Sequence, residues 1–390
     1  MKNNLNNIDE YKGNIFFCDS PFIAIIISEL INSENNNLIV LESKDFESNN
    51  ANIQIMQLIL KLKVDIQIIL NVPQPWNLIF RSNPLKTLTK LREFKNSIIE
   101  KFKFPKDAVY YGAVTSSLMM CSPVKNRIYI DHGFIEPIRR ISKISKKGMK
   151  INFFRTLALF LHKTVDIPPF DIEENRIGYS SCKLKDDKFK HINLEKYEIS
   201  NELYSLLLPL INKINYNQKV VVGLMSSDWH SGNTFPSYRE IYDEKNLNLI
   251  KRQCNKTDII FVKFHRQLFV NGFNSVNFTD YCRNNGYEVI DIDQLLPEQF
   301  QGIIPVEILI KPLGIKKIFA EVSGALINLS HIDDLEVTMD YSDFSLLRSK
   351  TEQGFIKQFI RLNEHLHIPF KIKNNIEVAQ VDLTPDLHTA

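Results

Sequence analysis

The chain has 390 residues, a length at which two domains are more usual than one compact core. Hydrophobic residues make up 44% and charged residues 24% of the sequence, which is the composition of a soluble globular protein. The net charge of +3 is too small to indicate nucleic-acid binding, and the apolar runs are too short to span a bilayer.

The five cysteines are odd in number and scattered, without the spacing of a metal site. This pattern predicts a reducing compartment and no disulfide framework. The first residues, Met1–Asn7, lack the apolar core of a signal peptide. We therefore expect a cytoplasmic protein.

The first half of the chain alternates short apolar runs with helical stretches. Asp19-Ser20-Pro21 provides a cap and a proline at the start of a helix predicted over 22–30. A long amphipathic helix is predicted over 85–102. Strands are expected at 14–18, 38–41, 65–70, 108–111 and 128–130. Such alternation predicts a parallel sheet with helices on both faces.

The second half repeats this pattern after a polar, proline-bearing stretch at about 141–194, which we interpret as a helical excursion and a connection. Helices are predicted over 201–214 and 344–366, and strands at 219–225, 259–263, 288–292 and 318–320. We divide the chain into an N-terminal Rossmann-like acceptor-side domain (1–200), a C-terminal Rossmann-like nucleotide-binding domain (201–375) and a frayed tail (376–390).

Two successive strand–helix domains that face one another describe the GT-B architecture, so the expected fold class is α/β with two parallel sheets. In this architecture the active cleft would lie between the two sets of carboxyl strand ends, a usual position for pockets.

An acid and a histidine end the strand at 128–130. Asp131, followed closely by a glycine that permits tight backbone geometry, can face a cleft and take a proton from an acceptor hydroxyl. A helix cap or loop acid is the competing interpretation of Asp131. His132 is the other candidate base, because its unperturbed pKa suits proton transfer near neutrality.

Lys263, His265 and Arg266 crowd three potentially cationic groups at another strand end. Such a group is costly to hold together without an anion, and a phosphate would relieve the repulsion and accept hydrogen bonds. The alternative is a surface strand end with solvated charges.

Two weaker signals follow. Ser323-Gly324 comes after a strand and opens an apolar helix, where free N–H groups and a hydroxyl suit an anion, although serine is also a common helix cap. Glu307 lies just inside a helix start, where it either accepts hydrogen bonds from a ribose or base or complements the helix dipole.

Asp291 and Asp293 form an Asp-x-Asp pair after a strand. Many metal-dependent glycosyltransferases hold a divalent ion on a sugar diphosphate with such a pair. Because no other acid cluster accompanies this pair, we predict no metal ion and no other cofactor.

In chain order, these segments resemble the bacterial sialyltransferases and polysialyltransferases that build lipooligosaccharide and capsule. Residues 14–22 look like the first strand and Pro-containing turn of that group. Asp131-His132-Gly133 is similar to its Asp/Glu-Asp/Glu-Gly motif, residues 263–266 to its His-Pro motif, and residues 304–307 to the segment before its last nucleotide-binding strand. Ser323-Gly324 stands where the group has a Ser-Ser or Ser-Thr pair.

The resemblance implies a GT-B fold, a CMP-activated sialic acid donor and inversion at the anomeric carbon. It makes Asp131 the base, His265 the acid or phosphate ligand, and Ser323 a phosphate ligand. Three positions depart from the pattern: His132 replaces the second acid, Arg266 the proline, and Gly324 the second hydroxyl residue. These departures leave His132 as an alternative base and admit a related nonulosonic acid or Kdo as the transferred sugar.

We therefore predict a metal-independent inverting glycosyltransferase whose substrates are a CMP-activated nonulosonic acid and a surface-glycan acceptor. The alternatives are a GT-B transferase using a UDP- or GDP-sugar, and a catalytically silent relative that binds glycan or nucleotide in a capsule-assembly complex.

Six basic residues between 139 and 150 form either a solvated helix face or a peripheral contact with the anionic inner membrane.

Overall fold

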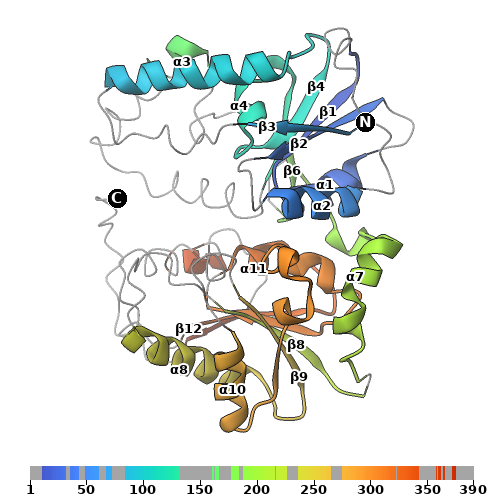
Figure 1. Cartoon of the computed structure of the whole chain (residues 1–390), viewed down its shortest axis with the longest axis vertical. Coiled ribbons are helices and arrows are strands. Elements are labelled where there is room, and N and C mark those ends of the chain that lie inside the picture. Colours follow the sequence, from blue (N-terminus) through green and yellow to red (C-terminus); the bar gives the residue numbers. More distant parts are fainter. Residues whose placement is uncertain are drawn as a thin grey trace. The chain divides into compact units, whose positions relative to one another are not determined.

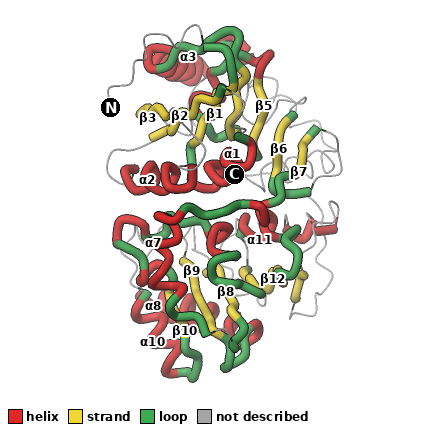
Figure 2. Tube along the Cα trace, turned by 90° about the vertical axis from the view of Figure 1, so that its right-hand side faces the viewer, coloured by secondary structure: helices red, strands yellow, loops and turns green. Residues whose placement is uncertain are grey.

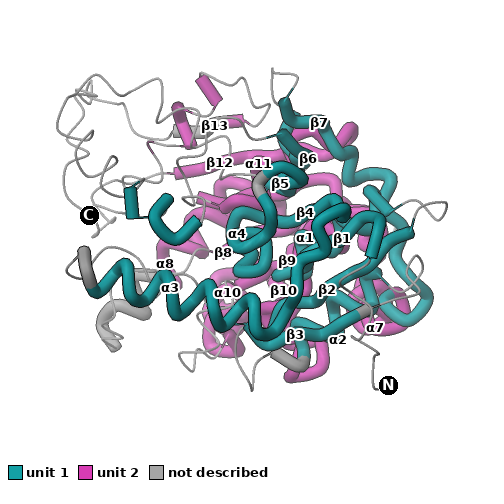
Figure 3. The backbone as a smooth tube through the Cα atoms, turned by 90° about the horizontal axis from the view of Figure 1, so that it is seen from above, with its two compact units in different colours: residues 1–132, 147–203 teal, residues 133–146, 204–390 magenta. Residues whose placement is uncertain are grey.

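The computed structural model describes residues 11–31, 36–43, 49–60, 67–72, 84–131, 160–161, 163–166, 177–183, 188–215, 217–225, 236–264, 275–321, 323–341, 357, 359–361, 363–364 and 371–374. These residues form two compact units, which Figure 3 shows in separate colours. Unit 1 holds the described residues up to Leu203, and unit 2 holds those from Tyr204 onward. The boundary falls inside helix α7 (Asn201–Ile211).

Unit 1 is built on a parallel sheet in which seven described strands lie in the order β3-β2-β1-β4-β5-β6-β7. The strands are β1 (Asn14–Cys18), β2 (Asn37–Ser43), β3 (Gln67–Asn71), β4 (Val109–Ala113), β5 (Arg127–Ile130), β6 (Gly178–Ser180) and β7 (Phe189–His191). The helices are α1 (Pro21–Leu30), α2 (Asn49–Leu60), α3 (Pro84–Lys101) and α4 (Ser117–Cys121). Figures 1 and 2 show α3 over one face of the sheet and α1 and α2 over the other.

The predicted cap-and-proline start of α1 is confirmed. The Ser20 hydroxyl accepts a hydrogen bond from the Ile23 backbone N–H at 3.4 Å, and Pro21 opens the helix. The helix is buried along most of its length, as its apolar sequence requires. In the preceding strand, Phe17 packs against Phe102 with ring centroids 5.6 Å apart. Together these contacts fix the exit of β1 and the start of α1.

Unit 2 has a second parallel sheet, with six described strands in the order β10-β9-β8-β11-β12-β13. The strands are β8 (Val220–Met225), β9 (Ile259–Phe264), β10 (Val289–Asp291), β11 (Lys317–Ala320), β12 (Glu336–Tyr341) and β13 (Lys371–Asn374). The helices are α8 (Pro236–Gln253), α10 (Val276–Asn284) and α11 (Gly324–Leu329), with short 3-10 turns at η5 (Asp293–Leu295), η6 (Glu298–Phe300) and η7 (Val306–Leu309). Helices α8 and α10 cover one face and α11 the other (Figures 1 and 2).

The face of this sheet under α8 and α10 carries a hydrophobic core. Phe264 at the end of β9 meets Phe278 of α10 edge-on, with ring centroids 5.5 Å apart. Gly223 of β8 lies under the Phe319 ring, which a Cβ atom at position 223 would overlap. Every residue of β8 is buried, as expected for a central strand.

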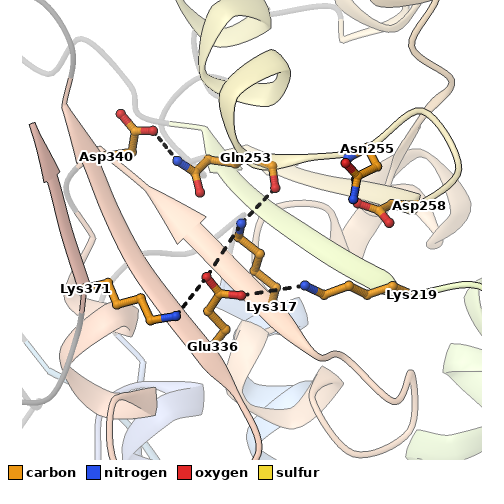
Figure 4. Close-up of polar contacts among 8 residues, drawn as sticks. All are labelled: Lys219, Gln253, Asn255, Asp258, Lys317, Glu336, Asp340 and Lys371. Atoms are coloured by element: carbon orange, nitrogen blue, oxygen red, sulfur yellow. Dashed lines mark hydrogen bonds and ion pairs between the residues drawn. The ribbon is translucent and has the colours of Figure 1, made fainter. Parts of the chain in front are cut away.

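Ion pairs and hydrogen bonds connect strand β12 to neighbouring elements of unit 2 (Figure 4). Glu336 at the start of β12 lies within ion-pair distance of Lys219, Lys317 and Lys371, at 3.6, 3.8 and 3.3 Å. Burial opposes ionisation of Glu336, but these lysines together lower its pKa. Farther along β12, the fully buried Asp340 accepts hydrogen bonds from Arg252 at the end of α8.

The predicted fold class is confirmed: the protein is α/β, with two parallel sheets covered by helices. In each sheet the second and third strands are added in turn on one side of the first strand, and the fourth strand lies on the other side of the first. Both sheets therefore contain the 3-2-1-4-5-6 order of a Rossmann-type domain. The facing of two such domains, which GT-B architecture requires, stays a prediction.

Some sequence predictions differ from the structure. Strands β6 and β7 lie within 141–194, which was interpreted as a helical excursion, and strand β13 lies beyond the strands predicted for the second half. Strands β6 and β7 have three residues each, too few to show an alternating pattern. Gly178 of β6 passes so close to the Tyr129 backbone that a Cβ atom would overlap it. The last dozen residues, predicted to be frayed, lie outside the described residues.

All five cysteines are described, and each is a free thiol. Among the described helices, none is long and apolar enough to cross a bilayer.

Candidate active site

Each sheet has one topological switch point, where the chain changes the direction in which it adds strands. In unit 1 this point lies between β1 and β4, and in unit 2 between β8 and β11. Because all strands are parallel, their carboxyl ends share one edge of each sheet. Ligands of open α/β sheets bind in the crevice outside those carboxyl ends. Both switch points are therefore candidate binding positions.

At the switch point of unit 1, Asp19 follows β1 and Thr115 follows β4. The Thr115 hydroxyl donates to Asp19 Oδ2 at 2.6 Å, and both residues are partly exposed. From the sequence, residues 19–21 were predicted as a helix start, and Thr115 was not among the candidate site residues. The available signal was a polar residue directly after an apolar strand, but pairing it with position 115 requires the strand order.

Asp131 follows β5, next to β4 in the same sheet. Its backbone N–H donates to the Tyr179 carbonyl at 2.9 Å, and the Ser180 hydroxyl donates to Oδ2 at 3.0 Å. The residue is 4% exposed. Asp131 thus ends a strand as predicted, and its carboxylate is oriented by the neighbouring strand β6. His132 lies outside the described residues.

Lys263 lies near the carboxyl end of β9, and its charge is balanced within the protein. Its ammonium is 3.2 Å from Oδ1 and 3.5 Å from Oδ2 of Asp293, which is fully buried. The Gly302 backbone N–H also donates to Asp293 Oδ1, at 2.8 Å. Sequence analysis expected the strand-end cations to need an external anion, and for Lys263 the structure supplies Asp293 instead. His265 and Arg266 lie outside the described residues.

The Asp-x-Asp pair serves the internal structure of unit 2. Asp291 Oδ1 accepts the Asp293 backbone N–H at 2.9 Å, while the Asp293 carboxylate contacts Lys263. No group of three or more His, Cys, Asp or Glu residues is placed to hold a metal ion among the residues that the structure describes. Burial raises the pKa of Asp291 to about 6, and the nearby Asp293 charge adds to the shift.

This raised pKa predicts a pH-dependent effect of Asp291→Asn. A carboxyl whose pKa is higher in the folded state than in the unfolded state lowers stability above its folded pKa, and the cost disappears below its unfolded value. The amide keeps an acceptor for the Asp293 N–H but carries no charge. We expect the variant to be more stable than wild type by about 2–3 kcal/mol at neutral pH, and about equal near pH 4. Urea unfolding across this pH range measures the difference. Asp280→Asn, an exposed acid, is the control, and a gain independent of pH would contradict the assignment.

Glu307 lies in the turn η7 and meets helix α11. Asn328 Nδ2 donates to Glu307 Oε1 at 2.8 Å. Burial of the carboxyl raises its pKa, whereas the Asn328 hydrogen bond and the Lys263 charge lower it. Glu307 remains partly exposed. Lys263, Asp293 and Glu307 thus form one electrostatically coupled group in unit 2.

Ser323 and Gly324 lie at the switch point of unit 2, directly after β11. The Ser323 hydroxyl accepts the Ala325 backbone N–H at 3.3 Å and caps α11. Helix α11 has six residues, so a contribution from its dipole is small. Lys245 of α8 forms an ion pair with Glu321 just after β11. Residues 226–230, which follow β8, lie outside the described residues.

A scan against models of known protein families finds no match, and a search of curated proteins finds none either. Among solved structures, the chain is similar to the ADP-heptose LPS heptosyltransferase II of E. coli, with 10% identity and a TM-score of 0.34 over 90% of this chain and 98% of that one. It is also similar to the wall teichoic acid polymerase TagF, with 10% identity and a TM-score of 0.37 over 89% of each chain. Scores this low carry no argument, so the fold assignment rests on the strand order of the two sheets.

Proposed function

We propose that this protein is an inverting glycosyltransferase that moves sialic acid or a related nonulosonic acid from its CMP ester to a hydroxyl of a bacterial surface glycan. The observation that carries the proposal is the pair of Rossmann-type sheets, each with polar side chains at its carboxyl edge. The order of the short motifs along the chain supports the choice of donor. The proposal therefore combines an observed topology with a sequence resemblance.

The reaction is a single displacement. The acceptor oxygen forms a bond to the anomeric carbon as the bond from that carbon to the CMP phosphate oxygen breaks. Asp131, or His132 in its place, takes the acceptor proton. Asp131 suits this role because the Ser180 hydroxyl and the Tyr179 carbonyl fix its side chain and backbone.

Unit 2 would bind the nucleotide. Lys263 has three donors, and orientation by Asp293 leaves a donor for the phosphate. In this proposal His265 and Arg266 complete the phosphate site, with the Ser323 hydroxyl and the Gly324 N–H after β11, on the other side of β8. Glu307, held by Asn328, accepts hydrogen bonds from the nucleoside.

The proposed donor carries one phosphate, so the site must balance the charge of a single phosphate monoester when CMP leaves. His265 and Arg266 can balance the charge of a departing monoester, and Lys263, whose charge is paired with Asp293, can add a hydrogen bond. A diphosphate leaving group would place more charge on the same residues. The proposed enzyme therefore works without a metal ion or other cofactor. We further propose that it works in the cytoplasm, with the basic stretch at 139–150 at the inner membrane surface.

Thermal shift against a nucleotide panel tests the choice of donor. A ligand that binds only the folded state raises the unfolding temperature, and at a given concentration a tighter ligand raises it more. We expect CMP and CDP to stabilise the protein, and UDP and GDP to have little effect. Stabilisation by UDP or GDP instead would favour the transferase that uses those sugars.

A second experiment distinguishes the catalytically silent relative. CMP binding that is unaffected by His265→Ala, without turnover, would indicate that alternative.

A further inference from the structure

The switch point of unit 1 holds a polar pair to which no role has been assigned above. Strands β1 and β4 are neighbours, with Phe17 opposite Gly112, so Asp19 and Thr115 emerge together at the carboxyl edge. The Thr115 hydroxyl donates to Asp19 Oδ2 at 2.6 Å. Both residues keep part of their surface exposed. Position and exposure fit a ligand in this crevice.

The turn that carries Thr115 is braced by a side chain of β2, which lies on the far side of β1 from β4. Glu42, near the end of β2, accepts hydrogen bonds from the Ser116 hydroxyl and from the Ser117 backbone N–H, the latter at 3.0 Å. The Ser116 oxygen in turn accepts the Met119 N–H at 2.9 Å. Glu42 and Ser116 are buried. Thr115 is therefore held in place before any ligand arrives, which reduces the entropy lost on binding.

The chemistry of this edge indicates the kind of ligand. Three described acids, Asp19, Glu42 and Asp131, lie within two positions of the carboxyl ends of β1, β2 and β5. A phosphate or carboxylate ligand would be repelled here, whereas neutral hydroxyl groups would not. The Thr115 oxygen can accept from a sugar hydroxyl while its own proton goes to Asp19 Oδ2, and this oxygen, rather than the buried Oδ1, is the one placed to accept from a second hydroxyl.

We propose that Asp19 and Thr115 form the subsite that binds adjacent hydroxyls of a neutral acceptor sugar. This inference rests on the proposed function, to which it adds the residues that determine acceptor binding. Asp19 and Thr115 select and position the acceptor. The proton of the acceptor hydroxyl goes to the proposed base, Asp131 or His132.

Steady-state kinetics with separate variation of donor and acceptor test the subsite. Loss of a hydrogen bond to a charged group predicts an acceptor KM about 10–100-fold higher in Asp19→Asn and Thr115→Val, with donor KM and CMP affinity unchanged. Thr115→Ser retains the hydroxyl and should restore most of the affinity. Asp166→Asn, an exposed acid of the same unit, is the matched control. Circular dichroism confirms folding of each variant.

Direct binding provides a readout that does not need turnover. In saturation-transfer NMR, the wild type is expected to show contacts with at least one of lactose, N-acetyllactosamine and mannobiose, and Asp19→Asn to lose them. An unchanged acceptor KM in both variants would overturn the inference, as would a loss of kcat at constant KM or a wild type that binds none of the three sugars. Failure of the proposed function is a different result, namely no CMP binding by the wild type.

Discussion

Asp131→Asn is expected to slow glycosyl transfer by about 10²–10⁴-fold, the usual contribution of a positioned general base, while CMP binds as tightly as to the wild type. The amide can still accept the hydrogen bond that Ser180 donates at 3.0 Å, so the end of β5 keeps its geometry. It cannot take a proton. Rates of CMP release at saturating donor and acceptor, together with CMP affinity by calorimetry, measure the two effects.

The pH profile distinguishes Asp131 from His132. If Asp131 is the base, the acid limb of kcat/KM in the wild type disappears in Asp131→Asn and remains in His132→Asn. Asp166→Asn should leave both rate and profile unchanged, because that carboxyl is exposed and paired only loosely with Lys95 at 3.4 Å. Full activity of Asp131→Asn with loss of activity in His132→Asn would transfer the role to the histidine.

Arg252→Met is expected to lower the free energy of unfolding by about 3 kcal/mol. The Arg252 Nε atom lies 3.2 Å from both carboxylate oxygens of Asp340, whose side chain is fully buried in β12. Removing one partner of such a pair leaves an uncompensated charge in the interior, which costs far more than the pair itself contributes. The substitution keeps the apolar stem that packs at the end of α8. Urea unfolding followed by circular dichroism measures the loss.

The chain offers a matched control for this variant. Arg283 and Asp280 of α10 also form an ion pair, at 2.7 Å, but their side chains are 63% and 51% exposed. Solvent screens such a pair, so Arg283→Met should cost less than about 1 kcal/mol. Equal losses in Arg252→Met and Arg283→Met would show that burial of Asp340 does not determine the effect.

Most of the parallel strands of both units were predictable because their sequences show a continuous apolar run. β8 is an example: its six residues are all buried, and its sequence Val-Val-Val-Gly-Leu-Met reads as a central strand. Asp131 was placed correctly after a strand for the same reason, since a polar residue that ends an apolar run marks the strand end. After β11 that residue is Glu321, and Ser323 follows two positions later. The short strands β6 and β7 gave no such signal.

Contacts between strand ends were not predictable, because they depend on strand order. The pairing of Lys263 with Asp293 joins the ends of β9 and β10, thirty residues apart in the sequence. The Thr115–Asp19 hydrogen bond spans 96 residues and depends on the return of the chain to the other side of β1. Local sequence identifies which residues end strands, but it does not show which strand ends are neighbours.

The most direct test of the proposed function is CMP release from CMP-sialic acid by the purified full chain, with a galactosyl acceptor, measured with and without a chelator. The proposal predicts acceptor-dependent release of CMP, formation of a product with inverted anomeric configuration, and the same rate in chelator. Absence of turnover with every CMP-nonulosonate offered, or complete loss of activity in chelator, would contradict it.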